Sequence, residues 1–411
     1  MTGKPAGSLR ICLMSSDYLP NAGGIAAHVA GLAGGLARAG CVVTVVVPGA
    51  TRSPCKAGAT HDNSVGFRVF RTRTWAPPLV GRLWWRRAQV EGIRRAVARE
   101  GFDVCHWHTP GADAQIASRL PARLRVFTNH TSQFLEWAAD DGSLWRARQC
   151  LLSAEIVICP SKELADATIS MGFPPESVRH LPNGVDTERF HPGIDRQEVR
   201  RRLAIAEDEV VFLCPRRLEK KNGVPFWLRA IPAVLAELEG DIKPRFVLIG
   251  DYPGKDEYSD RTNVLAIIHE LSLGERLQWI GHVPPEEMPK HLAAADVCVL
   301  PSLMEATSIA GLEAMACARP LIGTRVGGIP EIVEDGSTGV LVPRADSAAL
   351  AETMIWLARD PDLRGRMGEA ARRRAVSEFG WDAVAARTLA LYVETLAIQA
   401  QSFSSPRPGG R

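Results

Sequence analysis

The 411-residue sequence lacks the features that mark several classes of protein. No run of about 18 or more apolar residues is present, so we expect no transmembrane helix. The residues before the first expected strand contain no long apolar stretch of the kind found in secretory signal peptides. These absences favour a cytoplasmic protein, with peripheral attachment to the inner face of a membrane left open.

Metal-binding and nucleic-acid-binding signatures are also missing. The nine cysteines are scattered, with no CxxC pair and no His/Cys cluster at zinc spacing, which fits a reducing compartment. The formal net charge of +3 does not suggest nucleic acid as a partner. A content of 46% hydrophobic and 23% charged residues is typical of a globular chain.

Short apolar runs alternate with longer helical patterns, which predicts α/β domains with parallel sheets and helices on both faces. Strands are expected at 10–14, 42–47, 104–107, 126–128, 156–159, 210–214, 246–250, 277–281, 297–300, 320–323 and 340–342, and helices at 25–39, 83–100, 161–170 and 381–399. The division we expect is an N-terminal Rossmann-like domain (1–182), a linker (183–193), a C-terminal Rossmann-like domain (194–380), a long helix (381–401) and a disordered tail (402–411).

The most informative segment runs from Pro301 to Pro343. It carries two carboxylates, Glu305 and Glu313, on either side of a predicted helix start at Ala306-Thr307-Ser308-Ile309. A helix N-terminus favours a phosphate, and flanking carboxylates can accept hydrogen bonds from sugar hydroxyls. This arrangement suits a nucleotide sugar, although either carboxylate alone could be an exposed helix residue.

Cations and glycines follow two other predicted strands. Arg217 and Lys221 lie just past a strand end, which suits a diphosphate, but they could belong to a solvated basic patch. Arg216 and Lys220 are their local competitors. The pair Gly23-Gly24 precedes a helical pattern and would allow close approach of a phosphate or sugar, or could simply form a tight turn. No complete GxGxxG follows, which argues against a dinucleotide site.

Three histidines follow predicted strands. His106 and His108 form an HxH pattern, but no third metal ligand is nearby in the sequence. His130 follows the next strand and is the better candidate for an active-site residue, with a capping or core histidine as the alternative. The segment Trp84-Trp85-Arg86-Arg87 begins either a membrane-surface helix or, as we favour, an ordinary covering helix.

These motifs together resemble the family 4 retaining glycosyltransferases, which have the GT-B fold. The resemblance covers roughly residues 9–400: the glycine loop followed by His28, the stretch RRLEKKNG, the interdomain signature at 183–186 and the Glu-x7-Glu segment. Many members have Gly-Phe-Gly where this chain has Ala306-Thr307-Ser308. The backbone N–H groups remain, so the phosphate role survives, while contacts to the donor sugar are expected to differ.

The resemblance implies retaining transfer of a hexosyl group from a nucleoside-diphosphate sugar, most simply a UDP-sugar, to a hydroxyl acceptor, lipid-linked or not, in glycoconjugate, polysaccharide or natural-product biosynthesis. It also implies that the N-terminal domain binds the acceptor, that the C-terminal domain binds the nucleotide sugar and that the final helix crosses back to the N-terminal domain. No cofactor and no metal are expected. Alternatives left open are an isomerase or hydrolase of the UDP-N-acetylhexosamine 2-epimerase type and a non-catalytic nucleotide-sugar binder. The implied catalytic residues are His130, Arg217, Lys221 and Glu305. The implied donor-binding residues are Gly24, Arg217, Lys221, Gly250, His282, Ala306, Thr307, Ser308, Ile309 and Glu313, and Gly23 and Gly24 are implied to contact the acceptor.

Individual roles are implied in the same way. Arg217 and Lys221 would hold the diphosphate, Glu313 the ribose and Glu305 the donor sugar. His130 would lie near that sugar, with its backbone carbonyl close to the anomeric carbon. A front-face mechanism, in which the donor phosphate accepts the acceptor proton, follows from the resemblance.

Overall fold

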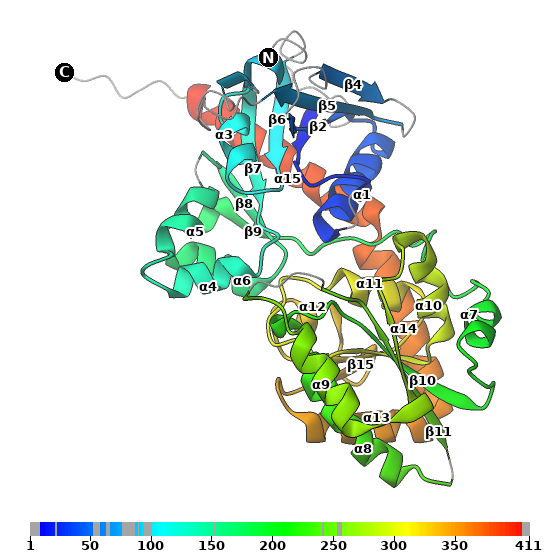
Figure 1. Ribbon diagram of the computed structural model, residues 1–411. Coiled ribbons are helices and arrows are strands. Elements are labelled where there is room, and N and C mark those ends of the chain that lie inside the picture. Colours follow the sequence, from blue (N-terminus) through cyan, green and yellow to red (C-terminus); the bar gives the residue numbers. More distant parts are fainter. Residues whose placement is uncertain are drawn as a thin grey trace. The chain divides into compact units, whose positions relative to one another are not determined.

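The computed structural model describes residues 9–20, 23–51, 58–62, 66–75, 87–88, 90–93, 101–151, 153–240, 242–252 and 257–404. The chain divides into two compact units, which Figure 1 shows. Unit 1 comprises residues 1–184 and 381–411, and unit 2 comprises residues 185–380. Each unit is built on a sheet of mainly parallel strands, which confirms the predicted fold class.

The sheet of unit 1 has the strand order β3-β5-β2-β1-β6-β7-β8-β9, with β4 paired antiparallel to β5 at one side. The other pairings are parallel. The strands are β1 (Arg10–Met14), β2 (Val42–Val47), β3 (Ala50–Thr51), β4 (Gly58–Asp62), β5 (Arg68–Trp75), β6 (Phe102–Trp107), β7 (Ala122–Thr128), β8 (Ile156–Cys159) and β9 (Val178–His180).

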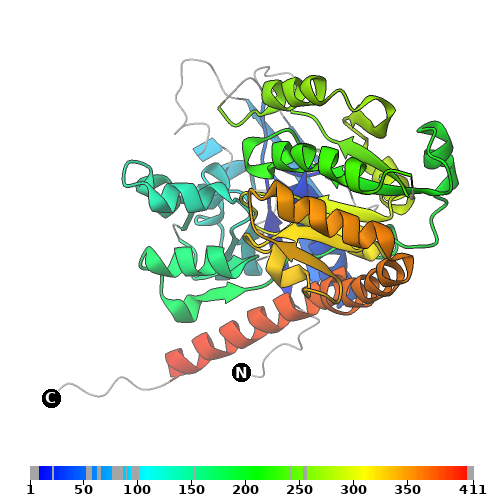
Figure 2. The same ribbon diagram turned by 90° about the horizontal axis from the view of Figure 1, so that it is seen from below.

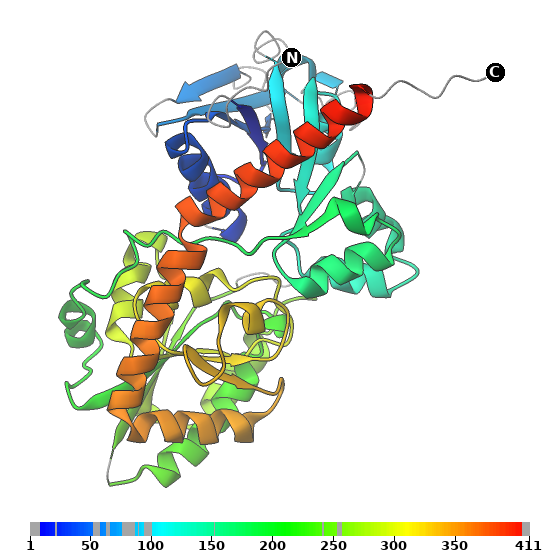
Figure 3. The same cartoon turned by 180° about the vertical axis from the view of Figure 1, so that it is seen from behind.

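One face of this sheet packs against two helices that are far apart in the sequence, α1 (Gly24–Arg38) and α15 (Trp381–Ser404). Figure 3 shows α15, in red, crossing this face beside α1. The shared core includes Leu13, Val29 and Tyr392, all buried. The remaining helices of the unit are α3 (Ala112–Ala117), α4 (Gln133–Ala139), α5 (Leu144–Leu151) and α6 (Lys162–Ser170).

The sheet of unit 2 has the order β12-β11-β10-β13-β14-β15, and every pairing is parallel. Counted from β10, this is the 3-2-1-4-5-6 order of a Rossmann fold. The chain reverses direction across the sheet between β10 and β13, and ligands of such sheets bind at this switch point. The strands are β10 (Glu209–Pro215), β11 (Lys243–Ile249), β12 (Leu277–Gly281), β13 (Val297–Leu300), β14 (Leu321–Thr324) and β15 (Gly339–Val342).

Helices cover both faces of this second sheet. Side chains alternate along each strand, so apolar residues point to both faces and each face needs a covering layer. On β10, Phe212 packs into one core with Trp227, and Leu213 packs into the other with Leu312. The helices α8 (Val224–Glu237), α9 (Arg261–Leu271) and α13 (Ser347–Arg359) lie side by side over the first core (Figure 2). The other helices are α7 (Gln197–Arg202), α10 (Met288–Ala294), α11 (Ile309–Ala316), α12 (Ile329–Ile332) and α14 (Pro361–Phe379).

Several expectations differ from what the structure contains. The apolar-run criterion does not predict β3, β4, β5 or β9, because these strands are short or rich in polar residues. The expected linker 183–193 is packed, since Val185 and Phe190 are buried in a core of unit 2. Residues 402–404, assigned to a disordered tail, continue α15, and residues 405–411 lie outside the described residues.

Most of the expected helix 83–100 also lies outside the described residues, and with it Trp84, Trp85 and Arg86. Within the described part of the chain, none of the helices is both long enough and apolar enough to cross a bilayer.

The contact between α1 and α15 generates a stability prediction for Gly35→Ala. A Cβ at Gly35 would lie 2.7 Å from the Ala385 Cβ and from the Trp381 carbonyl oxygen. A Cβ at Gly34, in the same helix, would meet only the end of the flexible Arg38 side chain, at 3.3 Å. We expect overpacking to make Gly35→Ala destabilising by about 1–3 kcal/mol.

The matched control, Gly34→Ala, should be neutral or add up to about 1 kcal/mol through higher helix propensity. Differential scanning calorimetry of both variants is the measurement. Equal melting temperatures for the two would contradict the described packing of α1 on α15.

Candidate active site

The predicted donor-site residues of unit 2 lie on the loops that follow β10 and β13. These strands are adjacent and parallel, with Leu213 opposite Cys298. Their carboxyl ends therefore face the same edge of the sheet, at the switch point. The loop 216–223 follows β10 and the loop 301–308 follows β13.

Helix α11 begins directly after the second of these loops. Its N-cap is Ser308, whose Oγ accepts a hydrogen bond of 3.1 Å from the Gly311 backbone N–H. Ala306, Thr307 and Ser308 are buried in the free protein. The helix start is therefore where the sequence predicts it, and its dipole favours an anion at this end.

The two predicted diphosphate cations share one buried carboxylate. The Arg217 Nη1 atom lies 2.9 Å from Glu219 Oε1, and the Lys221 Nζ atom lies 3.5 Å from Glu219 Oε2. The Glu219 side chain is only 8% exposed, whereas that of Arg217 is 64% exposed. Glu219, which the sequence argument did not single out, therefore sets the positions of both cations while leaving Arg217 open to solvent.

Backbone contacts join the two loops. The Lys221 carbonyl oxygen accepts hydrogen bonds from the N–H groups of Leu303 (2.7 Å) and Met304 (3.2 Å). Gly223 has a φ of +65°, and a Cβ there would lie 2.0 Å from the Pro301 carbonyl oxygen. A glycine is required at this close approach, which brings the cation loop against the loop that leads to Glu305.

Glu305 forms a salt bridge with Arg216, with 2.8 Å between Oε2 and Nη2. The Arg216 Nη2 atom also donates to Ser308 Oγ at 3.1 Å, and the Arg216 side chain is 9% exposed. From the sequence alone, Arg216 is expected to compete with Arg217 for phosphate. In the structure it has a different partner, since it connects the first carboxylate of the motif to the cap of α11.

A glycine pair supports the same loop from the other side. Gly327, with a φ of +52°, would place a Cβ 1.6 Å from the Glu305 carbonyl oxygen, and the Gly328 N–H donates to the Ala306 carbonyl at 3.1 Å. Sequence reasoning missed this pair. The available signal was the Gly-Gly sequence shortly after a predicted strand end, where a backbone approaches closely.

Glu313 lies on α11 in a different environment from Glu305. Burial raises the pKa of its carboxyl group to about 7, and the positive charge of Arg189 acts in the opposite direction. Among the described residues, Glu305 has a direct cationic partner, Arg216, whereas Glu313 has only the more distant Arg189. The two carboxylates of the motif are therefore electrostatically distinct.

Gly250 and His282 lie at the same edge of the sheet. Gly250, with a φ of +126°, would place a Cβ 2.3 Å from the Arg216 carbonyl oxygen, and its N–H donates to the Gly281 carbonyl at 2.7 Å. His282 follows β12 and is exposed. Gly250 and His282 therefore lie along the same edge of the sheet as the loop that carries Arg217 and Lys221.

The other predicted site residues belong to unit 1. Gly23 is the N-cap of α1, Gly24 is its first residue, and both are exposed. Nearby, the loops after β1 and β6 are joined by Asp113, which accepts hydrogen bonds from the Ser16 N–H (2.6 Å) and the Thr109 hydroxyl. Burial raises the pKa of Asp113, and these hydrogen bonds oppose the shift.

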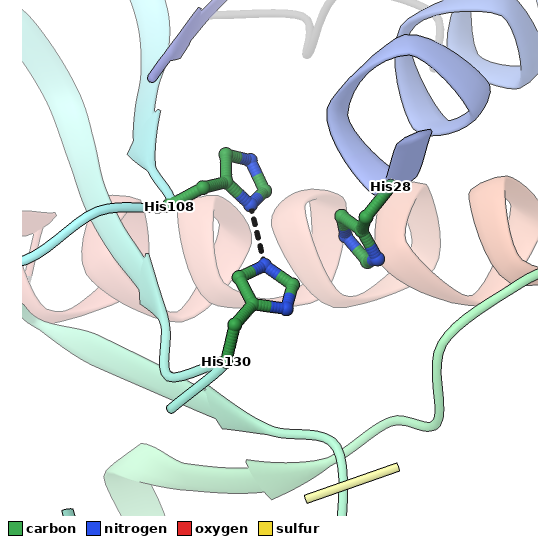
Figure 4. A group of neighbouring side chains, drawn as sticks. All are labelled: His28, His108 and His130. Carbon is green, nitrogen blue, oxygen red and sulfur yellow. Dashed lines mark hydrogen bonds between the residues drawn. The ribbon is translucent and has the colours of Figure 1, made fainter. Parts of the chain in front are cut away.

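The histidines of unit 1 form a cluster, shown in Figure 4. The His108 Nδ1 atom lies 3.1 Å from His130 Nε2, and the ring centroids of His28 and His130 are 4.4 Å apart. Burial lowers the pKa of His28 to about 4 and the pKa values of His108 and His130 well below their usual range. No third metal ligand lies near the HxH pattern in the sequence, but in the fold helix α1 and the loop after β7 bring His28 and His130 to His108.

His106 has a different environment. Its Nδ1 atom lies 2.6 Å from the Tyr392 hydroxyl and its Nε2 atom lies 2.6 Å from the Thr128 hydroxyl. Both ring nitrogens of His106 have hydrogen-bond partners in the core. Through Tyr392, the side chain of His106 links α15 to strand β6 of the sheet.

Two family models match the chain. The model described as "Glycosyltransferase Family 4" matches residues 22–189, and the model described as "Glycosyl transferases group 1" matches residues 195–374. Among curated proteins, D-inositol 3-phosphate glycosyltransferase of Streptomyces scabiei is 30% identical over 324 residues, covering 75% of this chain and 72% of that protein. Alpha-maltose-1-phosphate synthase of Mycolicibacterium smegmatis is 29% identical over 407 residues, which cover 93% of this chain and 99% of that protein.

A third relative is the GDP-mannose-dependent alpha-(1-6)-phosphatidylinositol monomannoside mannosyltransferase of Mycolicibacterium smegmatis, at 28% identity over 394 residues, covering 91% of this chain and 96% of that protein. Solved structures also match. Sucrose-phosphate synthase from Thermosynechococcus elongatus has a TM-score of 0.76 at 24% identity, covering 95% and 100% of the two chains. Anabaena HepE, solved with UDP and glucose, has a TM-score of 0.71 at 21% identity, and the match covers 96% of this chain and 100% of that one.

Substitution by alanine should destabilise the protein far more at Arg216 than at its neighbour Arg217. Arg216→Ala leaves the Glu305 carboxylate without its partner in a largely buried site, so we expect the free energy of unfolding to fall by about 3 kcal/mol. Arg217→Ala removes an exposed side chain and leaves Glu219 with Lys221 as a partner, so the free energy of unfolding should fall by less, about 1 kcal/mol or below. Urea denaturation of both variants measures the difference, and equal stability would contradict the role given to Arg216.

Proposed function

Because the chain belongs to the family 4 glycosyltransferases and has their GT-B fold, we propose that it transfers a hexosyl group from a nucleoside-diphosphate sugar to a hydroxyl acceptor with retention of the anomeric configuration. The donor we propose is a UDP-sugar. The observation that carries the proposal is that two cations, the Glu305 carboxylate and the N-terminus of α11 lie on two adjoining loops at the switch point between β10 and β13, with Glu313 further along the same helix.

We assign the diphosphate to Arg217, Lys221 and the N-terminus of α11. Glu219 holds both cations close to the loop that ends in this helix. A preorganised positive site of this kind stabilises the charge that develops on a departing diphosphate. It also supplies the electrostatic stabilisation that a divalent ion would otherwise give, so we propose catalysis without a required metal.

The two carboxylates suit the two ends of the donor. Glu313, which has no direct cationic partner among its described contacts, is free to accept hydrogen bonds from ribose hydroxyls. Glu305 is fixed by Arg216 beside the helix cap, and a fixed carboxylate can distinguish the hydroxyl pattern of one sugar from another. His130 is proposed to act near the sugar as a neutral imidazole, in keeping with its lowered pKa.

No carboxylate is assigned as a nucleophile. Asp113 of unit 1 is buried and engaged by Ser16 and Thr109, which gives it a structural role. We therefore propose a front-face reaction, in which the donor phosphate accepts the proton of the attacking hydroxyl while the diphosphate leaves.

The proposal is tested with a panel of nucleotide sugars that includes UDP-hexoses and GDP-mannose, assayed in excess EDTA. We expect release of nucleoside diphosphate that depends on an added acceptor, and proton NMR of the fresh product should show the anomeric configuration of the donor. Release without acceptor would indicate a hydrolase or isomerase. An inverted product, or complete loss of turnover in EDTA with recovery in magnesium, would contradict the mechanism.

Glu313→Gln should weaken nucleoside diphosphate binding, whereas Glu305→Gln should leave it nearly unchanged. A charged acceptor for a hydroxyl pair contributes about 1.5–3 kcal/mol, which corresponds to roughly ten- to a hundredfold in affinity. Glu305→Gln should instead reduce discrimination between sugars on one nucleotide. Calorimetric titration with UDP measures both variants, and the reverse order would overturn the assignment.

The raised pKa of Glu313 adds a pH dependence to this test. With a pKa of about 7, the carboxyl group is mostly protonated at pH 6 and mostly ionised at pH 8. If the ionised form binds ribose better, UDP affinity should rise across this interval by up to about tenfold. Glu313→Gln should remove the rise in affinity that comes from Glu313. Any change in affinity that comes from ionisation of UDP itself should be the same in both proteins.

A further inference from the structure

Three imidazoles in unit 1 come from three separate elements and meet at one place. His28 lies on α1, His108 follows β6 and His130 follows β7. Figure 4 shows the three rings turned toward a common space. One ring nitrogen from each of the three residues lies within 4.8 Å of those of the other two.

Hydrogen bonding accounts for only some of the ring nitrogens, since His108 Nδ1 pairs with His130 Nε2 and His28 bonds to Asn183. Among the described residues, His28 Nδ1 and His108 Nε2 are buried nitrogens without a hydrogen-bond partner. His106, two residues before His108 in the sequence, has both nitrogens bonded to hydroxyl groups. Leaving buried polar atoms unpartnered is unfavourable, and such groups call for an explanation such as a bound ion.

The chemistry of the cluster selects a class of ion. Burial keeps the three imidazoles neutral near pH 7, which is the form that binds metals. In the described part of the chain, the cluster consists of imidazoles alone, without a carboxylate or a thiolate. Imidazole suits Zn²⁺, Co²⁺, Ni²⁺ and Cu²⁺ and is a poor ligand for Mg²⁺ or Ca²⁺.

The distances are close to those of a metal site. Zinc–nitrogen bonds of about 2.0–2.1 Å at a tetrahedral angle separate two ligand nitrogens by about 3.3 Å. His108 Nδ1 and His130 Nε2 are 3.1 Å apart. A rotation of the His28 ring that moves its nitrogen by about 1–1.5 Å would complete three ligand positions on one ion.

We propose that His28, His108 and His130 bind one divalent transition-metal ion, through one ring nitrogen each, with the fourth position open to water or another ligand. Three protein ligands with an open position is the usual pattern of a zinc site that is not purely structural. Because His130 is also proposed to act on the sugar, a bound ion would compete with glycosyl transfer. That consequence rests on the proposed function, whereas metal binding itself does not.

The test is direct titration of the untagged full-length protein, freed of metal, with Zn²⁺ in competition with a chromophoric chelator. We expect one equivalent of Zn²⁺ to bind with a dissociation constant below about 1 µM. Co²⁺ should give the visible d–d bands of a tetrahedral nitrogen site. Thiolate-to-cobalt charge transfer would assign the ion to cysteines and overturn the proposal.

His28→Gln, His108→Gln and His130→Gln should each weaken Zn²⁺ binding by at least tenfold, with the fold checked by circular dichroism. The matched control is His269→Gln, an exposed histidine on α9 in the other unit, and it should bind Zn²⁺ like the unaltered protein. Absence of stoichiometric binding to the unaltered protein, or unchanged affinity in all three cluster variants, would refute the site. Since no glycosyl transfer is measured, either result leaves the proposed function standing.

Discussion

The buried ion pair between Arg216 and Glu305 is the constraint on which the rest of the unit 2 site depends. It joins the residue after β10 to the loop after β13, and the same guanidinium reaches the cap of α11. An ion pair in a site with so little solvent is tolerated only when its geometry is well satisfied. The position of the first carboxylate and the start of the helix are therefore fixed by one side chain.

Close backbone approaches make that geometry possible. Gly223 meets the Pro301 carbonyl, Gly250 meets the Arg216 carbonyl and Gly327 meets the Glu305 carbonyl, each at a distance that excludes a Cβ. All three have positive φ, which glycine adopts without strain. The loops of the switch point are thus packed against one another by backbone, and the cations and carboxylates project from a rigid base.

The two units share a strand order around their switch points but place different chemistry there. In unit 2 the edge carries paired charges. In unit 1 it carries a buried aspartate that joins two loops and a cluster of neutral imidazoles. The same topology therefore carries the proposed anion site in one unit and a nitrogen-rich cluster in the other, because chemistry resides in the loop residues and the fold supplies only their placement.

The sequence by itself determined the fold class, most strands of both sheets, the start of α11 and the segments in which the cations and carboxylates lie. These are local properties, readable from apolar runs, helix starts and residues at strand ends. The tertiary structure alone decided the rest. Arg216 and Arg217 are neighbours in sequence, and only the fold gives the first a buried carboxylate and leaves the second exposed. His28, His108 and His130 are far apart along the chain, and no spacing rule brings them together, because their meeting depends on how α1, β6 and β7 pack in three dimensions.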